Sequence, residues 1–460
     1  MLHRYQLNGY NLVLDVNSGA VHVLDGLSYE LSGLISAPMA DSCPEDALIA
    51  LRARYPEAEI REAYEELYEL YRAGQLFTED DYERFASLTA VSPVKAMCLH
   101  IAHDCNMRCE YCFASTGDYQ EGRALMSEEV GKRAIDYLLR FSAGRRNLEV
   151  DFFGGEPLMN FDVVKKVVEY ARSKEAEYGK NFRFTITTNG LLLDDDKIDF
   201  INREMSNVVL SIDGRREVND RVRRGANGKS CFDAIVPKFQ KLVRERGNLP
   251  YYARGTFTKY NLDFTQDVLF LNSLGFDQIS VEPVVADESA PYALTEADLP
   301  RIYEEYETLA KEMIKREKNG GWFNFFHFML DLDQGPCAIK RLRGCGCGNE
   351  YVAVTPDGEV YPCHQFVGHP EWKMGSVSDQ SIDMAIKETF AKSTVYGKES
   401  CRGCWAKFYC SGGCNASGMI YNGDILKPHR MSCETEKKRV ECALMIKAAA
   451  LLNEEELETV

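Results

Sequence analysis

Three cysteines within eight residues carry the strongest chemical signal of the sequence. Cys105, Cys109 and Cys112 follow directly after an apolar run that ends at His103. Thiolates at spacings of four and three residues can converge from one loop on a soft metal centre, and thiolates are the usual ligands of iron–sulfur clusters. A four-iron cluster takes four ligands, so three local cysteines leave one iron open for chemistry. From spacing alone, buried or zinc-binding cysteines are the alternative.

A second group of cysteines lies in the glycine-rich C-terminal region. The two-residue spacing between Cys401 and Cys404 is typical of metal sites, and both zinc and iron–sulfur clusters are compatible with it. The turn Pro356–Gly358 predicts a hairpin that ends at Cys363. The candidate ligands of this group are Cys345, Cys347, Cys363, Cys401, Cys404, Cys410, Cys414 and Cys433.

Composition limits the class of protein. The chain has 460 residues, of which 45% are hydrophobic and 27% charged, and this predicts a globular protein of about three domains. The net charge of −17 argues against a nucleic-acid or membrane partner. The chain has no apolar run long enough to cross a bilayer, and its start lacks the pattern of a secretory signal. We therefore expect a cytoplasmic location, where sixteen cysteines indicate metal binding or catalysis rather than disulfides.

Alternating strands and helices are predicted between residues 97 and 318. Such alternation favours a parallel sheet with helices outside and a site at the C-terminal ends of the strands. The predicted strands are Met97–His103, Leu148–Phe153, Phe182–Thr188, Val208–Ile212, Tyr251–Thr256 and Gln278–Val284. The predicted helices are 127–141, 161–178, 194–204, 231–246, 263–274 and 295–318.

Several polar or glycine residues follow these strands where a ligand would bind. Glycines free the backbone for a close approach, and small polar side chains can hydrogen-bond a ribose or a carboxylate. Plain turns and loop caps are the alternative, and for Arg223 it is a surface ion pair. Glu282 is expected to be an ordinary carboxylate at a strand end. The candidate binding residues are Gly154, Gly155, Glu156, Asn189, Ser211, Asp213 and Arg223.

The N-terminal 80 residues predict a small separate module. Strands at Tyr10–Val16 and Ala20–Leu24 flank a turn, and helices are expected over Pro44–Arg54 and Glu59–Ala73. This order is compatible with a winged-helix-like arrangement. Its acidic composition argues against DNA binding. A purely structural extension is the alternative.

The spacing of the first cysteines, with Tyr111 before the last of them, resembles the signature of radical S-adenosylmethionine enzymes. The resemblance implies that Cys105, Cys109 and Cys112 hold a [4Fe-4S] cluster and that S-adenosylmethionine chelates its fourth iron. One electron then cleaves the cofactor to a 5′-deoxyadenosyl radical. The family also implies a partial barrel of six units. Its motifs assign the cofactor region to Tyr111, Gly154, Gly155, Glu156, Asn189, Ser211, Asp213 and Arg223.

The C-terminal region resembles the SPASM domain, which carries two auxiliary four-iron clusters. The resemblance implies a first cluster on Cys345, Cys363 and Cys414. The fourth ligand of this cluster is open between Cys347, a substrate thiolate and no ligand. The resemblance assigns the second cluster to Cys401, Cys404, Cys410 and Cys433. The expected cofactors are therefore S-adenosylmethionine and three [4Fe-4S] clusters.

These elements predict an α/β protein whose centre is a partial (β/α)6 barrel. A winged-helix-like peptide-recognition module precedes the barrel, and a cysteine-rich SPASM domain follows it. The predicted segments are a recognition module (1–80), a linker (81–96), the barrel (97–318), a bridge (319–344), the SPASM domain (345–435) and a C-terminal helix (436–460).

The whole arrangement is most similar to maturases of SCIFF peptides, whose products are ranthipeptides. The resemblance implies an oxidoreductase that forms thioethers between cysteine thiols and carbons of acceptor residues. Its partners would be a cysteine-rich precursor peptide, whose leader is added as a strand to the N-terminal module, and a low-potential reductant. The alternatives are a sulfatase-maturing enzyme, a carbon–carbon crosslinking maturase, and a non-enzymatic electron carrier or zinc scaffold. The sequence does not identify a general base.

Overall fold

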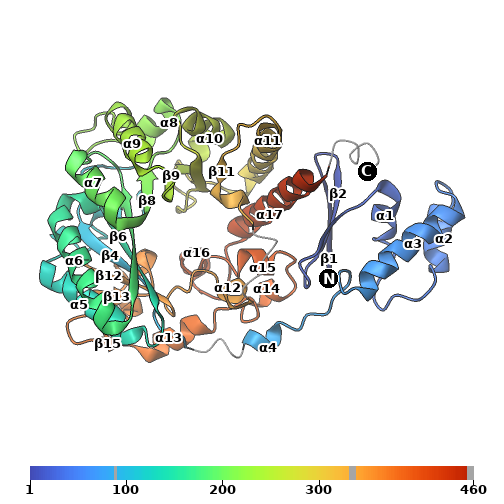
Figure 1. Ribbon diagram of the computed structural model, residues 1–460, viewed down its shortest axis with the longest axis horizontal. Helices are drawn as coiled ribbons and strands as arrows, with labels where there is room; N and C mark the ends of the chain where they lie inside the picture. The colour runs from blue at the N-terminus through green and yellow to red at the C-terminus, as the bar shows by residue number, and fades with distance from the viewer. Residues whose placement is uncertain (87–90, 331–337, 453–460) are drawn as a thin grey trace.

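The computed structural model describes residues 1–86, 91–330 and 338–452. Figure 1 shows the N-terminal module at one end of the molecule and the strand–helix units at the other. The long helix α17 (Arg430–Leu451) lies between them. None of the described helices is long and apolar enough to cross a membrane.

The N-terminal module is a three-stranded antiparallel sheet followed by three helices. Its strand order is β1–β2–β3, and β2 and β3 match the two predicted strands. The first strand and the first helix were not predicted. One hydrophobic core joins sheet and helices through Val13, Leu48, Ile60 and Leu67. The bounds are β1 (Leu2–Leu7), β2 (Tyr10–Asp15), β3 (Val21–Val23), α1 (Gly26–Leu31), α2 (Glu45–Leu51) and α3 (Glu57–Arg72).

The barrel strands run parallel in the order β10–β9–β8–β7–β6–β4. All six strands predicted from the alternating pattern are present, and their ends agree within a few residues. The short β5 (Ala124–Leu125) and β11 (Asn324–Phe325) are additional. The strands are β4 (Ala96–His103), β6 (Asn147–Gly154), β7 (Asn181–Thr188), β8 (Met205–Ser211), β9 (Tyr251–Phe257) and β10 (Gln278–Pro283).

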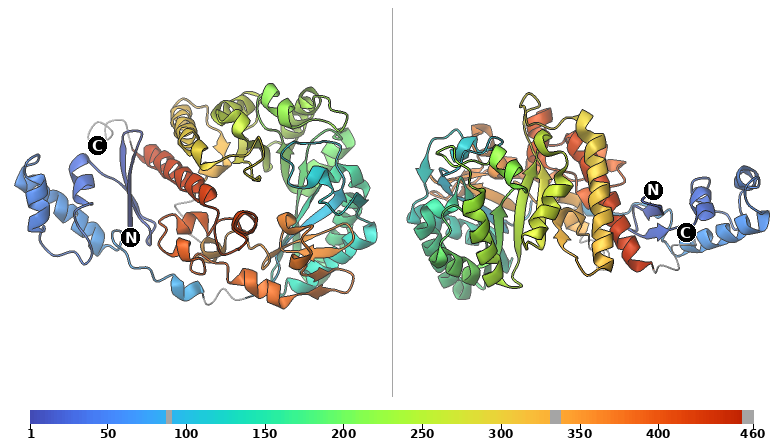
Figure 2. Two further views of the ribbon diagram at one scale, coloured as in Figure 1. Left: turned by 180° about the vertical axis from the view of Figure 1, so that it is seen from behind. Right: turned by 90° about the horizontal axis from the view of Figure 1, so that it is seen from above.

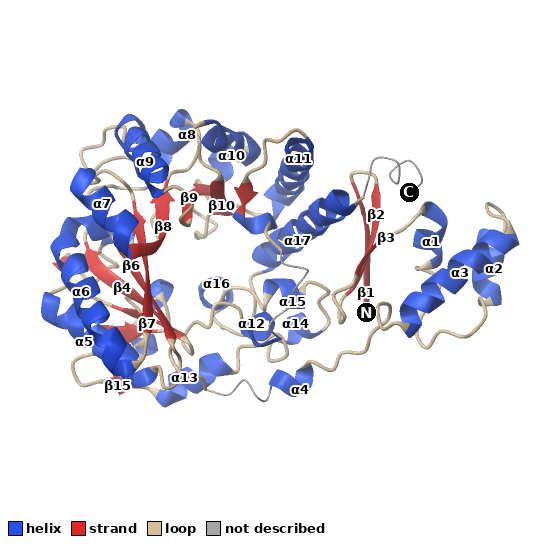
Figure 3. Ribbon diagram, viewed as in Figure 1, coloured by secondary structure: helices blue, strands red, loops and turns tan. Residues whose placement is uncertain are grey.

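The helices cover the outer face of this sheet, as Figure 3 shows by colour. The six predicted helices are present, and α8 (Arg216–Val222) is added after β8. The last helix begins later than predicted because residues 295–298 form a capping box in which Thr295 and Asp298 bond each other. The six are α5 (Glu128–Phe141), α6 (Phe161–Tyr178), α7 (Asp195–Glu204), α9 (Phe232–Arg246), α10 (Phe264–Ser273) and α11 (Leu299–Lys318).

The C-terminal region extends the barrel sheet. Its predicted hairpin is present as β12 (Tyr351–Val354) and β13 (Glu359–Tyr361), and β12 pairs in parallel with β4. The strands β14 (Gly375–Ser376) and β15 (Ser381–Ile382) continue the sheet beyond the hairpin. The sequence did not predict this pairing. The helices here are α12 (Ala338–Arg343), α13 (Met384–Ala391), α14 (Glu399–Arg402), α15 (Lys407–Cys410) and α16 (Asn415–Asn422).

Helix α17 fixes the N-terminal module to the rest of the chain (Figure 2). Tyr5 in β1 donates a hydrogen bond to the carbonyl of Glu441, and the ring of His3 stacks on Trp405 at 3.6 Å. The predicted linker takes part as well. It contains α4 (Glu83–Ala86), and Asp80 accepts a hydrogen bond from Tyr396 at 2.5 Å. The N-terminal module is therefore attached to the rest of the chain both through β1 and through the segment that follows α3.

The inner face of the barrel is polar and partly exposed. Along β6 and β7 every second residue is fully buried against the helices, whereas the residues between them face the interior and stay accessible. Buried parallel strands are usually apolar on both faces. The exception here leaves room for ligands inside the barrel. Asp151 belongs to this inner face, and burial raises the pKa of its carboxyl group to about 6.

The raised pKa of Asp151 predicts that Asp151→Asn stabilises the native state, by an amount that depends on pH. The native chain holds the proton up to about pH 6, whereas the unfolded chain releases it near its ordinary pKa of 3.8. Ionisation therefore costs the native state stability as the pH rises through this window. The variant should be more stable than wild type by about 3 kcal/mol well above pH 6 and nearly equal to wild type at about pH 4. Denaturant unfolding of the cluster-free chain measures this. Glu169→Gln, which removes an exposed carboxylate on α6, is the control, and an equal effect of Asp151→Asn at both pH values would refute the assignment.

Candidate active site and cysteine clusters

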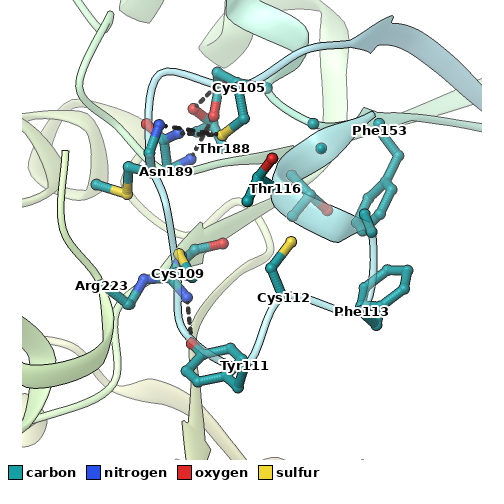
Figure 4. Close-up of a pocket in the computed structure, with 18 residues that line it drawn as sticks. Cys105, Cys109, Tyr111, Cys112, Phe113, Thr116, Phe153, Thr188, Asn189 and Arg223 are labelled. Carbon is teal, nitrogen blue, oxygen red and sulfur yellow. Dashed lines mark hydrogen bonds between the residues drawn. The ribbon is translucent and has the colours of Figure 1, made fainter. Parts of the chain in front are cut away.

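The loop after β4 holds three thiols around one cavity. Cys105, Cys109 and Cys112 line a cavity of about 140 Å³ at the C-terminal ends of the barrel strands (Figure 4). The loop is pinned from outside, because the N–H of Glu110 donates to the carbonyl of Val222 at 2.8 Å. Burial raises the pKa of Cys105 to about 12 and that of Cys109 to about 11. The free thiols are thus neutral, and metal binding there releases protons.

Gly154, the last residue of β6, and Gly155, the next residue, pack against the backbone at the start of this loop. Gly154 has a φ of +124°, and a Cβ there would lie 2.3 Å from the carbonyl oxygen of Ala102. A Cβ on Gly155 would lie 2.1 Å from the carbonyl oxygen of Asp104. The two glycines are required because two backbones meet, which differs from the expected approach to a ligand. Both residues still line the cavity.

Glu156 is a buried carboxylate that organises the turn after β7. Its oxygens accept hydrogen bonds from the hydroxyl of Thr188 at 2.8 Å and from the N–H groups of Asn189 at 2.8 Å and Leu158 at 3.0 Å. Burial raises the pKa of Glu156 to about 7. The side chain of Asn189 donates to Asn106 at 2.8 Å and approaches the sulfur of Cys105 at 3.6 Å. The two turns and the cysteine loop therefore form one network.

Arg223, Tyr111 and Asp213 form a buried chain on the opposite wall. Arg223 donates to the Tyr111 hydroxyl at 2.6 Å, and Tyr111 donates to Asp213 at 2.7 Å. The N–H of Thr256 also donates to Asp213. Asp213 is fully buried behind the other two side chains, whereas Arg223, Tyr111 and Ser211 line the cavity. Among the described residues, the buried Nε of Arg223 has no hydrogen-bond partner.

The lining of the cavity fits the expected cluster and cofactor. Three thiols supply soft ligands, and Arg223, which is paired with Asp213 at 3.5 Å, keeps its Nε–H as a free donor that suits a carboxylate. Across the described residues, no three or more His, Cys, Asp or Glu side chains close around a single metal ion.

Three further lining residues were not predicted from the sequence. Phe113, Thr116 and Phe153 border the same cavity. Thr116 and Ser115 adopt φ values of +68° and +49°, in the left-handed region that glycine usually occupies. No glycine pattern marks these positions in the sequence. Only their closeness to Cys112 along the chain could have indicated that they line the cavity.

Four cysteines from three segments meet beside β12 and β13. Burial and the hydrogen bond that its S–H donates to Cys363 raise the pKa of Cys347, and the same hydrogen bond lowers the pKa of Cys363. Burial, together with the neighbouring Cys363 and Cys414, raises the pKa of Cys345. This group (the first auxiliary set: Cys345, Cys347, Cys363 and Cys414) holds four thiols, the number that a four-iron cluster takes.

The remaining four cysteines line a separate cavity of about 520 Å³. Burial, Glu436 and the neighbouring thiols raise the pKa of Cys410 to about 12. Burial and the neighbouring Cys401 and Cys404 raise the pKa of Cys433 to about 11. These four residues form the second auxiliary set: Cys401, Cys404, Cys410 and Cys433. The second set has the same four residues as the second cluster that the family resemblance implied, and the first set adds Cys347 to the three residues implied for the first cluster.

The other cysteines belong to none of these three groups. Cys43, Cys98, Cys231 and Cys442 are buried in the hydrophobic interior, and Cys337 lies outside the described residues. Glu282 faces the barrel interior from β10, where it pairs with Arg254 of β9 at 2.8 Å. It is therefore a paired carboxylate.

Two family descriptions match the chain. Residues 99–246 match the Radical SAM superfamily, and residues 345–405 match the SPASM iron–sulfur cluster-binding domain. The chain thus carries a radical SAM domain followed by a SPASM domain.

The curated relatives match the chain at low identity. An uncharacterised protein of Methanocaldococcus jannaschii is 30% identical over 194 residues, which are 42% of this chain and 63% of that protein, so the chain spans less than two thirds of it. A cysteine-type anaerobic sulfatase-maturating enzyme of Clostridium novyi is 26% identical over 336 residues. That match covers 68% of this chain and 85% of the relative.

Solved structures share the fold. The enzyme anSMEcpe with bound AdoMet superposes with a TM-score of 0.66 at 20% identity, and the match covers 80% of this chain and 97% of that one. SuiB of Streptococcus suis bound to its precursor peptide SuiA superposes with a TM-score of 0.53 at 16% identity. This match covers 94% of this chain, including the N-terminal module, and 98% of SuiB.

Arg223→Met should weaken binding of S-adenosylmethionine. The substitution removes the cationic donor at the cavity wall, and a hydrogen bond to a charged group contributes about 1.5–3 kcal/mol. We therefore expect an affinity loss of about 10- to 100-fold in anaerobic calorimetry with the cluster-loaded chain. Arg216→Met is the control, since Arg216 is exposed and paired with Asp233. Unchanged affinity in the Arg223 variant would contradict the assignment.

Proposed function

Because the chain carries a radical SAM domain followed by a SPASM domain, we propose that it is an oxidoreductase that modifies a ribosomally made, cysteine-rich precursor peptide. It joins cysteine thiols to carbons of acceptor residues through thioether bonds. For each bond, the 5′-deoxyadenosyl radical would take one hydrogen atom from the acceptor carbon, the thiol would release one proton, and the auxiliary clusters would take up the one surplus electron. It works with a low-potential reductant in the cytoplasm, where thiols stay reduced.

Each of the three thiol groups holds one [4Fe-4S] cluster in this proposal. On Cys105, Cys109 and Cys112 the cluster supplies the electron that cleaves S-adenosylmethionine to a 5′-deoxyadenosyl radical. The side chains of this chain bind and orient the cofactor. Arg223 holds its carboxylate, and the turns organised by Glu156 and Asn189 hold its amino and ribose groups. Cys347 is the fourth ligand of the first auxiliary set.

A second cavity next to the active cavity carries the proposal. It has a volume of about 150 Å³, and Phe113 lines both cavities. Its opposite wall includes His364 and Gln365, which follow directly after Cys363 of the first auxiliary set. Val285 and Ile420 give it an exposed apolar rim. A peptide seated there would present an acceptor carbon to the active cavity and a thiol to the first auxiliary set.

The free edge of β3 suits the leader of such a peptide. The backbone bonds from Asp15 to Ala20 and from Leu24 to Asn11 show that alternate residues of this segment face β2. By the antiparallel register, Val21 and Val23 therefore turn their N–H and carbonyl groups outward. His22 contacts the carbonyl of Gln75, so this edge borders the C-terminal end of α3. An extended leader can add here as a fourth strand.

Sulfatase maturation is the second candidate. The Clostridium novyi relative supports it, because that protein is a cysteine-type anaerobic sulfatase-maturating enzyme. Such an enzyme oxidises one cysteine or serine side chain, with no bond to a second residue. A peptide-recognition module with a free strand edge would then have no leader to bind.

The mass of the peptide product tests the proposal. The chain is co-expressed anaerobically with a cysteine-rich peptide encoded beside it, and the peptide is weighed before and after thiol alkylation. We expect a loss of two hydrogens per crosslink and cysteines that resist alkylation. Loss of two hydrogens with cysteines still alkylated would indicate carbon–carbon crosslinks and contradict the thioether. An aldehyde at a former cysteine would indicate formylglycine.

Matched cysteine variants give the control for this experiment. Cys112→Ala should abolish the modification because the active-site group loses one of its three ligands. Cys442→Ala should leave it intact, since Cys442 is buried in α17, outside the three thiol groups. Full modification by the Cys112→Ala variant would show that this cysteine loop takes no part in the reaction.

Val23→Pro should weaken leader binding without affecting the fold. The proline removes an outward N–H and leaves the bonds to β2 in place. We expect a loss of at least about tenfold in affinity for a labelled leader peptide, measured by fluorescence anisotropy. Gln6→Pro is the matched control, because Gln6 lies on β1 at the opposite edge of the sheet. Equal losses in both variants would refute β3 as the binding edge.

A further inference from the structure

Lys398 is a buried cation in the C-terminal region. The residue is 1% exposed. Its ammonium group donates hydrogen bonds to the carbonyl of Gly412 at 2.7 Å and to the side-chain oxygen of Asn415 at 2.9 Å. Both acceptors are neutral, and among the described residues no carboxylate lies within ion-pair distance of Lys398. A third N–H and the whole positive charge are left uncompensated.

Such a charge is costly without a counter-ion. Buried ammonium groups are normally paired, since transfer of an unpaired charge from water costs several kcal/mol. Lys407 of the same region follows this rule, because it is 3% exposed and pairs with Asp80 at 2.5 Å. Lys398 therefore requires negative charge from another source.

The two auxiliary sets are that source. Lys398 contacts the turn at Gly412 that joins Cys410 of the second set to Cys414 of the first, and a Cβ on Gly412 would lie 3.7 Å from its nitrogen. Its own carbonyl accepts the N–H of Cys401 at 3.0 Å. Burial lowers the pKa of Lys398, and thiolates at Cys401, Cys410, Cys414 and Cys433 oppose that shift. The ammonium group thus lies within electrostatic reach of both sets.

We propose that Lys398 is the shared internal counter-ion of the two auxiliary clusters. This inference rests on the clusters of the proposed function, in which four thiolates give each cluster a net negative charge. One-electron reduction adds a further negative charge, which the fixed cation stabilises. Lys398 is therefore a positioning residue that raises both reduction potentials and holds the two sets together through the Gly412 turn.

The potentials of the loaded chain test this role. Lys398→Met keeps the length of the side chain and removes its charge, and Lys398→Arg keeps the charge. In a redox titration followed by electron paramagnetic resonance, the Met variant should show auxiliary clusters about tenfold harder to reduce, a shift of about 59 mV for one electron. The cluster on Cys105, Cys109 and Cys112 should be unchanged, and the Arg variant should stay near wild type.

Lys387→Met is the matched control. Lys387 is also buried in this region, at 5% exposed, but it bonds the carbonyl of Asn349 and interacts with Glu350 rather than with thiols. Its removal should leave all potentials in place. Auxiliary potentials that stay fixed in the Lys398→Met variant, with about twelve irons bound, would overturn the proposal.

The melting temperatures of the cluster-free and cluster-loaded chains give a second test, because a role of Lys398 in packing alone would change both in the same direction. The cluster-free chain lacks the charge of the clusters, so Lys398→Met removes an uncompensated buried charge there and should raise the melting temperature or leave it unchanged. In the loaded chain the same change removes the counter-ion and should lower it. A decrease of equal size in both states would refute the counter-ion.

The iron content separates this proposal from the proposed function. About four irons per chain would refute the auxiliary clusters themselves. A variant that folds but takes up only the active-site irons, while Lys387→Met takes up all, would support the proposal.

Discussion

The pairing of β12 with β4 is the constraint on which the site depends. One strand, β4, ends in the cysteine loop of the active cavity, and its neighbour β12 begins the hairpin that ends at Cys363. Tyr351 lies opposite Ala96 and Val354 opposite Leu99, so the two strands share one register. A slip of that register would move Cys363 relative to Cys112 and turn side chains to the other face. The distance between radical chemistry and auxiliary chemistry is therefore set by backbone hydrogen bonds of one sheet.

Buried charge organises the rest of the site. Arg223 and Asp213 are both buried, and the hydroxyl of Tyr111 bonds both of them. The Nε of Arg223 has no partner among the described residues and is available to a ligand. Lys398 repeats the arrangement among the auxiliary cysteines with neutral acceptors only. Arg223 is paired with Asp213 at 3.5 Å and keeps only its Nε free, whereas Lys398 has no carboxylate partner among the described residues, so its unpaired charge is the one that calls for an anion.

Sequence reasoning found the six barrel strands, their helices and the two cysteine-rich regions because each has a local signal, whereas the division of the C-terminal cysteines into two sets came from the family resemblance. Alternation of period two and the spacing of cysteines are visible in a single sequence. The pairing of β12 with β4 joins residues more than two hundred and fifty positions apart in the chain and has no local signal. Lys398 was missed for a similar reason, since nothing local distinguishes a buried lysine from an exposed one. The role of Gly154 was misjudged because the neighbouring backbone of Ala102, rather than a ligand, excludes a side chain there.

The most direct test of the central claim follows the hydrogen atom. The reconstituted chain is given a precursor peptide in which the carbon-bound hydrogens of the acceptor residue are replaced by deuterium, and the 5′-deoxyadenosine is analysed by mass spectrometry. The account predicts one deuterium in 5′-deoxyadenosine for each thioether formed. Thioether formation with 5′-deoxyadenosine that carries no deuterium would contradict it, because the radical would then not have reacted with the acceptor residue of the peptide.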